Sequence, residues 1–137
     1  MRPAKEYLTV CTIGSLGYET LELLWRGFTH WSMGIAGGAG FLLLYLADLR
    51  MQGRSLLRRA LTGCAILTSV EFAAGCVVNK LLGLDVWDYS DEQGNLFGQI
   101  CPLYAILWFL LCIPVMPLGR MLRNRLSPPP FVRQIAG

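Results

Sequence analysis

A glutamate in the middle of an apolar stretch is the residue in this sequence whose setting most strongly suggests chemistry. Glu71 lies near the centre of a long apolar run, far from either end. Carboxylates at membrane depth are costly and usually face a bundle interior, where they bind protons, cations or substrates. At helical spacing, Glu71 shares a face with small and polar residues, and Asn79 continues that face. We expect both residues to line a cavity. The alternative is that Glu71 only hydrogen-bonds across helices and stabilises the bundle.

A second group of ionisable residues falls at the end of the first apolar stretch. Glu22 and Arg26 are four residues apart, so they can pair on one helix face. His30 follows at the start of the next stretch. We expect these three side chains to line a polar vestibule that opens outward. The alternative is an interfacial ion pair that orients the helix, beside a structural histidine.

The connector over residues 83–99 mixes aromatic side chains with carboxylates. It ends in apolar residues and glycines, which suit a fully solvated loop poorly. We therefore expect it to fold back and cover a cavity above Glu71, where protein groups satisfy its backbone. Its candidate binding residues are Trp87, Asp88, Tyr89, Ser90 and Asn95. In the alternative interpretation, the aromatic residues belong to an interfacial belt and the polar ones cap a turn.

Metal and cofactor chemistry has no clear signature in this chain. The five cysteines are an odd number, and they form neither CxxC nor CxH patterns. We expect no metal, no cofactor and no disulfide framework, and we interpret the cysteines as small packing residues. The phosphate-binding motif of an ATPase, GxxxxGK[ST], is also missing from the sequence.

The composition indicates a membrane protein. Hydrophobic residues make up 54% of the 137 residues and charged residues 15%, against roughly 25% charged in a soluble domain. This excludes intrinsic disorder, which requires low hydrophobicity and high charge. The net charge of +3 is also too small to favour a nucleic-acid partner.

Four apolar stretches are long enough to cross a bilayer core, which takes about 20 residues of helix. They cover approximately residues 7–25, 31–49, 60–82 and 100–118. We predict an all-α integral membrane four-helix bundle in a single domain over residues 1–125. A flexible, proline-rich tail is predicted over residues 126–137, because consecutive prolines cannot continue a helix.

The distribution of basic residues predicts the orientation. With four spans, one face of the membrane receives both termini and the connector between the second and third stretches. Ten of the 12 basic residues fall on that face, namely Arg2, Lys5, Arg50, Arg54, Arg58, Arg59, Arg120, Arg123, Arg125 and Arg133. Positive charge near helix ends marks the cytoplasmic side. We therefore expect a plasma-membrane protein with both termini in the cytoplasm.

Several motifs together resemble one known family. They are Tyr18 with Glu22-Leu-Leu-Trp-Arg26-Gly-Phe-Thr-His30-Trp-Ser-Met33, Gly37-Gly38, Glu71-Phe-Ala-Ala-Gly75-Cys-Val-Val-Asn79, Val86-Trp-Asp-Tyr-Ser90, Asn95-Leu-Phe-Gly-Gln-Ile-Cys101 and Trp108. Across about residues 10–115, the chain resembles the small bacterial multi-pass proteins of the CmpB-like, type IV, ABC-transporter permease family. The resemblance implies a role in transport. It also implies that Glu22, rather than Glu19, is the characteristic acid of the first helix.

These observations favour a permease-like membrane component with an outward-facing polar site for a small solute or ion. Its carboxylates suit a cationic or hydrogen-bonding ligand. Because four helices are few for a transport path, we expect a homo-oligomer or a partner membrane protein. One alternative is a structural or regulatory subunit of a larger membrane complex. A less favoured one is a membrane-embedded enzyme acting on a lipid, for which the sequence shows no nucleophile–base spacing.

Overall fold

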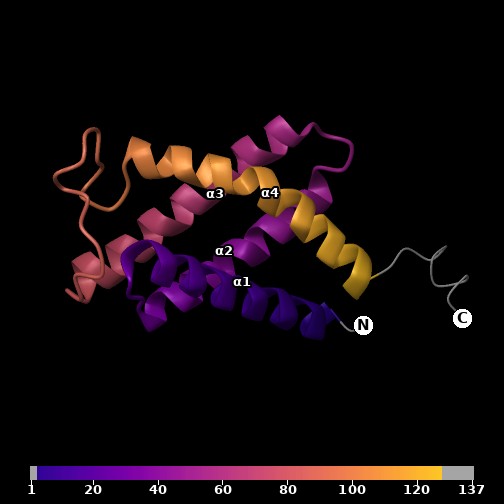
Figure 1. Cartoon of the computed structure of the whole chain (residues 1–137), viewed down its shortest axis with the longest axis horizontal. Coiled ribbons are helices and arrows are strands. Elements are labelled where there is room, and N and C mark those ends of the chain that lie inside the picture. Colours follow the sequence, from indigo (N-terminus) through magenta and orange to yellow (C-terminus); the bar gives the residue numbers. More distant parts are fainter. Residues whose placement is uncertain (1–2, 128–137) are drawn as a thin grey trace, which may run out of the picture.

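The computed structural model describes residues 3–127, which form four long helices and a loop that packs against them (Figure 1). The helices are α1 (Pro3–Arg26), α2 (Trp31–Arg50), α3 (Leu56–Gly75) and α4 (Pro102–Leu126). Helix α3 continues directly into a π-helical segment, Cys76–Leu81. The predicted all-α, four-helix fold is confirmed for this part of the chain.

Three of the helices are long and apolar enough to cross a membrane: α2, α3 with its π-helical continuation, and α4. Helix α1 has a similar length of 24 residues but is less apolar, and it carries charged residues at both ends. It falls outside this set, so its role as a fourth span stays a prediction. Helix α4 extends beyond its predicted end at residue 118, through Pro114 and Pro117, to Leu126. The predicted tail lies, from residue 128 onward, outside the described residues.

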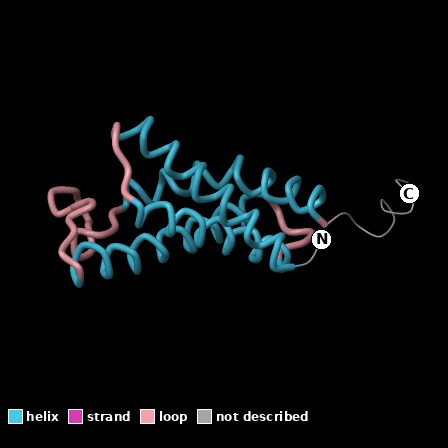
Figure 2. The backbone as a smooth tube through the Cα atoms, turned by 90° about the horizontal axis from the view of Figure 1, so that it is seen from below, coloured by secondary structure: helices cyan, strands magenta, loops and turns pink. Residues whose placement is uncertain are grey.

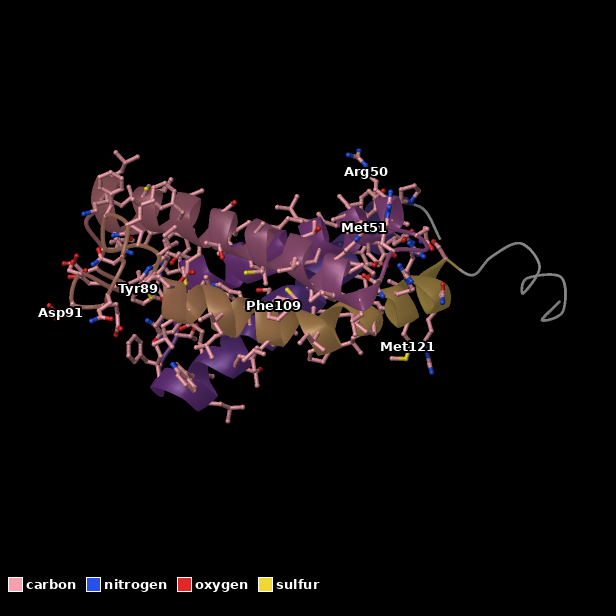
Figure 3. The ribbon with its side chains drawn as sticks, turned by 90° about the horizontal axis from the view of Figure 1, so that it is seen from above. Arg50, Met51, Tyr89, Asp91, Phe109 and Met121 are labelled. Atoms are coloured by element: carbon pink, nitrogen blue, oxygen red, sulfur yellow. The ribbon has the colours of Figure 1, made fainter. Side chains whose placement is uncertain are left out.

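The helices run lengthwise, so the connections gather at two ends (Figure 2). One end, the loop end, holds the 27–30 turn and the 82–101 loop. The opposite end, the termini end, holds the start of α1, the 51–55 turn and the end of α4. Figure 3 places Tyr89 and Asp91 at the loop end and Arg50, Met51 and Met121 at the termini end. The start of α1 and the end of α4 are joined there, where the Ser127 hydroxyl donates to Glu6 at 2.7 Å.

Helices α1 and α2 approach each other very closely through glycines. A Cβ added at Gly37 would lie 2.5 Å from Cβ of Tyr18, and one added at Gly38 would lie 2.9 Å from the Cys11 carbonyl oxygen. Small residues let helix backbones approach in this way within a membrane. The glycines of α2 therefore allow the backbones of α1 and α2 to pack closely.

We expect Gly37→Ala to lower the free energy of unfolding by about 1–3 kcal/mol, the usual cost of overpacking a well-packed site. Gly17→Ala is the matched control, because no atom lies within 4 Å of its added Cβ. The control should be neutral or slightly stabilising, since alanine favours the helix. Denaturant titration in mixed micelles measures both variants. Equal stability of the two would contradict the described contact between α1 and α2.

Helices α2, α3 and α4 are joined near the termini end by a buried group of charges. The carboxylate of Asp48, which is 3% exposed, accepts from Arg59 at 2.7 Å and from Arg120 at 2.9 and 3.0 Å. Buried charges persist only when they are paired and hydrogen-bonded. An apolar cluster that includes Leu44, Cys112 and Met116 packs between the same helices. This charged group and the apolar cluster fix α2, α3 and α4 relative to one another.

Candidate functional site

A cavity of about 530 Å³ lies among the four helices and below the 82–101 loop. It falls in the usual size range of small-molecule sites, roughly 300–1,000 Å³. The charged residues that line it are Glu22, Arg26 and Glu71, and seven aromatic residues belong to the same lining. The rest of the lining is almost entirely apolar. The cavity is therefore an apolar pocket with a few convergent polar groups.

Glu71 is held in place by two neutral hydrogen-bond donors. Its Oε1 accepts from the Tyr89 hydroxyl at 2.8 Å, and its Oε2 accepts from Trp108 Nε1 at 2.7 Å. The donors come from the loop and from α4, so three segments meet at one carboxylate. The expectation that Glu71 faces the protein interior holds in the structure. Because both donors are neutral, its negative charge is not matched by either of them.

Glu22 and Arg26 form the predicted ion pair on α1. Arg26 NH2 lies 2.5 Å from Glu22 Oε2, and the residue Glu22 is 7% exposed. Arg26 NH1 also donates to the carbonyl oxygen of Val86 at 3.0 Å, which ties α1 to the loop. The charges of Glu22 and Arg26 offset each other. Glu71 is thus the one charged lining residue whose side-chain partners are all neutral.

Aromatic rings form the wall of the cavity around Glu71. Tyr89 and Tyr104 are stacked, with ring centroids 4.5 Å apart, and the rings of Tyr18 and Trp108 lie 5.7 Å apart. Burial, followed by the charge of Glu71, raises the pKa of the Tyr89 hydroxyl above its ordinary value. Tyr89 therefore remains a protonated donor to Glu71 throughout the physiological pH range.

Asn79 fixes the loop over the cavity. Its Oδ1 accepts from the amide of Val86 at 2.7 Å, and its Nδ2 donates to Gln99 Oε1 at 2.8 Å. Trp87 Nε1 in turn donates to the Gln99 carbonyl at 3.0 Å. Asn79 lies in the π-helical segment, and such segments often occur at functional sites. The predicted folding-back of this loop is confirmed, but Asn79 holds the loop and does not itself line the cavity.

Asp88, Ser90 and Asn95 shape the loop from within. The Ser90 amide donates to Asp88 Oδ1 at 2.9 Å, and Asn95 Nδ2 donates to the carbonyls of Ser90 and Glu92. The hydrogen bonds from Ser90 hold the pKa of Asp88 below its ordinary value. Asp88 and Ser90 are placed as the turn alternative predicted. These three residues are exposed or half-buried and lie outside the cavity lining.

His30 is separated from the cavity. It is the N-cap of α2, where its Nδ1 accepts from the Ser32 amide at 3.2 Å and pairs with the Ser32 hydroxyl at 2.6 Å. The predicted vestibule is thus divided, because Glu22 and Arg26 line the cavity and His30 does not. His30 takes the structural role given as its alternative.

Tyr18 and Trp108 belong to the family-like motifs, but neither they nor Tyr104 were expected at the site. Tyr18, Tyr104 and Trp108 line the cavity, and Gln99 anchors the loop. Tyr18 was accessible from spacing, since it lies four residues before Glu22 on the same helix face. Tyr104 and Trp108 are likewise four residues apart on α4. The sequence gives no sign that this face of α4 meets Glu71.

One carboxylate without a charged partner, surrounded by aromatic faces, can bind a cation. Aromatic rings attract organic cations such as quaternary ammonium groups electrostatically, and the attraction is stronger where water is excluded. In the described chain the lining also contains no nucleophile beside a base. The arrangement suits binding better than covalent catalysis.

Comparison with known proteins gave one family. A family model described as "Putative ABC-transporter type IV" matches residues 9–135. No curated protein and no solved structure matches the chain. The matched range contains the whole cavity lining and the loop that covers it.

Proposed function

We propose that this chain, which belongs to the family described as "Putative ABC-transporter type IV", is the solute-binding membrane component of a transport system. Its solute is a small cation, bound in the cavity against Glu71. The family and the membrane-like helices make it a transporter-related membrane protein. The cation and its site are our inference.

The proposal rests on the hydrogen-bond partners and the surroundings of Glu71. Its carboxylate is fixed by Tyr89 and Trp108, faces the cavity and, when ionised, has no hydrogen-bond partner of opposite charge. Each carboxylate oxygen accepts one neutral hydrogen bond. The cavity beside the carboxylate is lined by aromatic rings, as a receptor for an ammonium group is.

Orientation and partners complete the proposal. The excess of basic residues at the termini end supports a cytoplasmic location for that end in the plasma membrane, so the loop-covered end of the cavity would lie toward the outer face. Among the described residues, the lining of the cavity is charged only toward the loop end. We therefore propose that transport requires a second copy or a partner membrane protein.

Equilibrium binding of tetramethylammonium to the full chain in lipid nanodiscs tests the proposal. Trp87 and Trp108 line the cavity, so bound cation should change tryptophan fluorescence saturably. Glu71→Gln should weaken binding at least tenfold, about 1.4 kcal/mol, because it removes the charge while keeping the shape. The control is Glu92→Gln, which alters an exposed loop carboxylate. Unchanged binding in Glu71→Gln, with insertion intact, would leave Glu71 a structural residue and refute the proposal.

A further inference from the structure

We propose that the natural ligand is a single-chain amphiphile, whose cationic head binds at Glu71 and whose hydrocarbon tail lies between α1 and α4. This inference rests on the proposed function and names the class of solute. It follows from the shape of the cavity, from the position of its polar groups and from its open side.

The cavity is elongated along the helices. Its lining follows α1 from Arg26 to Ile13 and α4 from Tyr104 to Leu118. Beyond Trp108, the α4 lining continues for ten residues, about 15 Å at the helical rise. A compact ion fills only a small part of such a space. Its length instead matches a medium-length alkyl chain attached to a small head group.

Polarity is confined to one end of this space. Glu22, Arg26, Glu71 and the aromatic wall all lie toward the loop end, below the 82–101 loop. Toward the termini end, the lining consists of residues such as Phe41, Leu44, Leu111 and Val115. A long apolar cavity with polar groups at one end is complementary to an amphiphile. A hydrophilic ion would occupy only the polar end and leave most of the volume empty.

The cavity is also bordered by apolar side chains that are exposed on the surface of the protein. Helix α1 packs mainly on α2, and α4 packs mainly on α3 (Figure 1). Exposed apolar side chains of α1 and α4 belong to the lining, including Leu24, Trp25 and Leu118. A tail can therefore enter sideways from the bilayer without crossing water. This entry suits a ligand that partitions into the membrane.

Photolabelling tests the inference in nanodiscs of phosphatidylglycerol, a lipid without an ammonium group. The probe is dodecyltrimethylammonium with a diazirine at the tail end, and mass spectrometry locates the label. We expect saturable labelling of residues near Val115 and Leu118, and at least tenfold tighter binding than tetramethylammonium. Replacing half of the phosphatidylglycerol with phosphatidylcholine distinguishes a bilayer lipid from a free amphiphile as the source of the ligand. Reduced labelling would show that a two-chain bilayer lipid occupies the site, which overturns the single-chain inference. Unchanged labelling supports a free single-chain amphiphile.

Filling the apolar end provides the matched comparison. Leu111→Phe places bulk inside the cavity, whereas Leu110→Phe places the same bulk on the exposed face of α4. Leu111→Phe should reduce the affinity for dodecyltrimethylammonium at least tenfold more than it reduces the affinity for tetramethylammonium, and Leu110→Phe should change neither. Val115→Phe repeats the test if Leu111→Phe fails to fold.

The outcomes separate this inference from the proposed function. If tetramethylammonium binds but the dodecyl tail adds no affinity, or labels only lipid-exposed positions, the amphiphile inference is wrong and the cation site stands. If neither probe binds, both are wrong. If native mass spectrometry shows a dimer that Leu111→Phe disrupts, the space is occupied by a second copy, which also overturns the inference.

Discussion

Replacing Asp48 by alanine is expected to lower the free energy of unfolding by about 3–5 kcal/mol, the cost of breaking a buried ion pair by removing one partner. Asp48 is 3% exposed and holds Arg59 and Arg120, which come from two different helices. Its removal leaves the Arg59 guanidinium buried and without its carboxylate. Helices α3 and α4 would then lose their shared attachment to α2 at the termini end.

Denaturant titration in mixed micelles measures this loss. Asp91→Ala is the control, since it removes an exposed carboxylate of the loop and should change stability by less than about 0.5 kcal/mol. The triple variant Asp48→Leu, Arg59→Met, Arg120→Met should be more stable than Asp48→Ala, because well-packed apolar residues can replace a buried charged group. A change below 0.5 kcal/mol in Asp48→Ala would show that these charges are solvated rather than buried.

Asn79→Ala is expected to release the loop from the bundle. The change leaves the amide of Val86 and Oε1 of Gln99 buried without their partner. Each such orphaned group costs about 1–3 kcal/mol, so the docked loop should lose about 2–6 kcal/mol. Because Tyr89 reaches Glu71 from this loop, the cation site should loosen with it.

Hydrogen exchange of residues 82–101 is the measurement for Asn79→Ala. We expect faster exchange throughout this segment and weaker tetramethylammonium binding, while α2 and α4 keep their protection. Asn95→Ala is the matched control, since Asn95 bonds only within the loop. It should disturb the loop tip and leave the docking of Trp87 intact. Wild-type exchange in Asn79→Ala would contradict the proposed anchoring.

The helices and the folding-back of the loop were predictable because they depend on local quantities. The length of each apolar stretch, the glycines of α2 and the four-residue spacing of Glu22 and Arg26 are all read directly from the sequence. The loop was predictable because its apolar residues have no favourable place in water.

The partners across helices were not predictable, because they depend on how each helix is rotated about its axis. Trp108 meets Glu71 only because one face of α4 turns toward α3. Arg59 and Arg120 looked like markers of the cytoplasmic side, yet they pair with Asp48 inside the bundle. Rotation and tilt arise from the packing of all the helices together, which one sequence does not display.

The most direct test of the account is an experimental structure of the chain in a lipid nanodisc with tetramethylammonium. The account predicts density for the cation in the cavity, in contact with the Glu71 carboxylate and with the rings of Tyr89 and Trp108. A structure in which Glu71 points outward at acyl chains, or in which side chains fill the cavity and leave no bound cation, would contradict it.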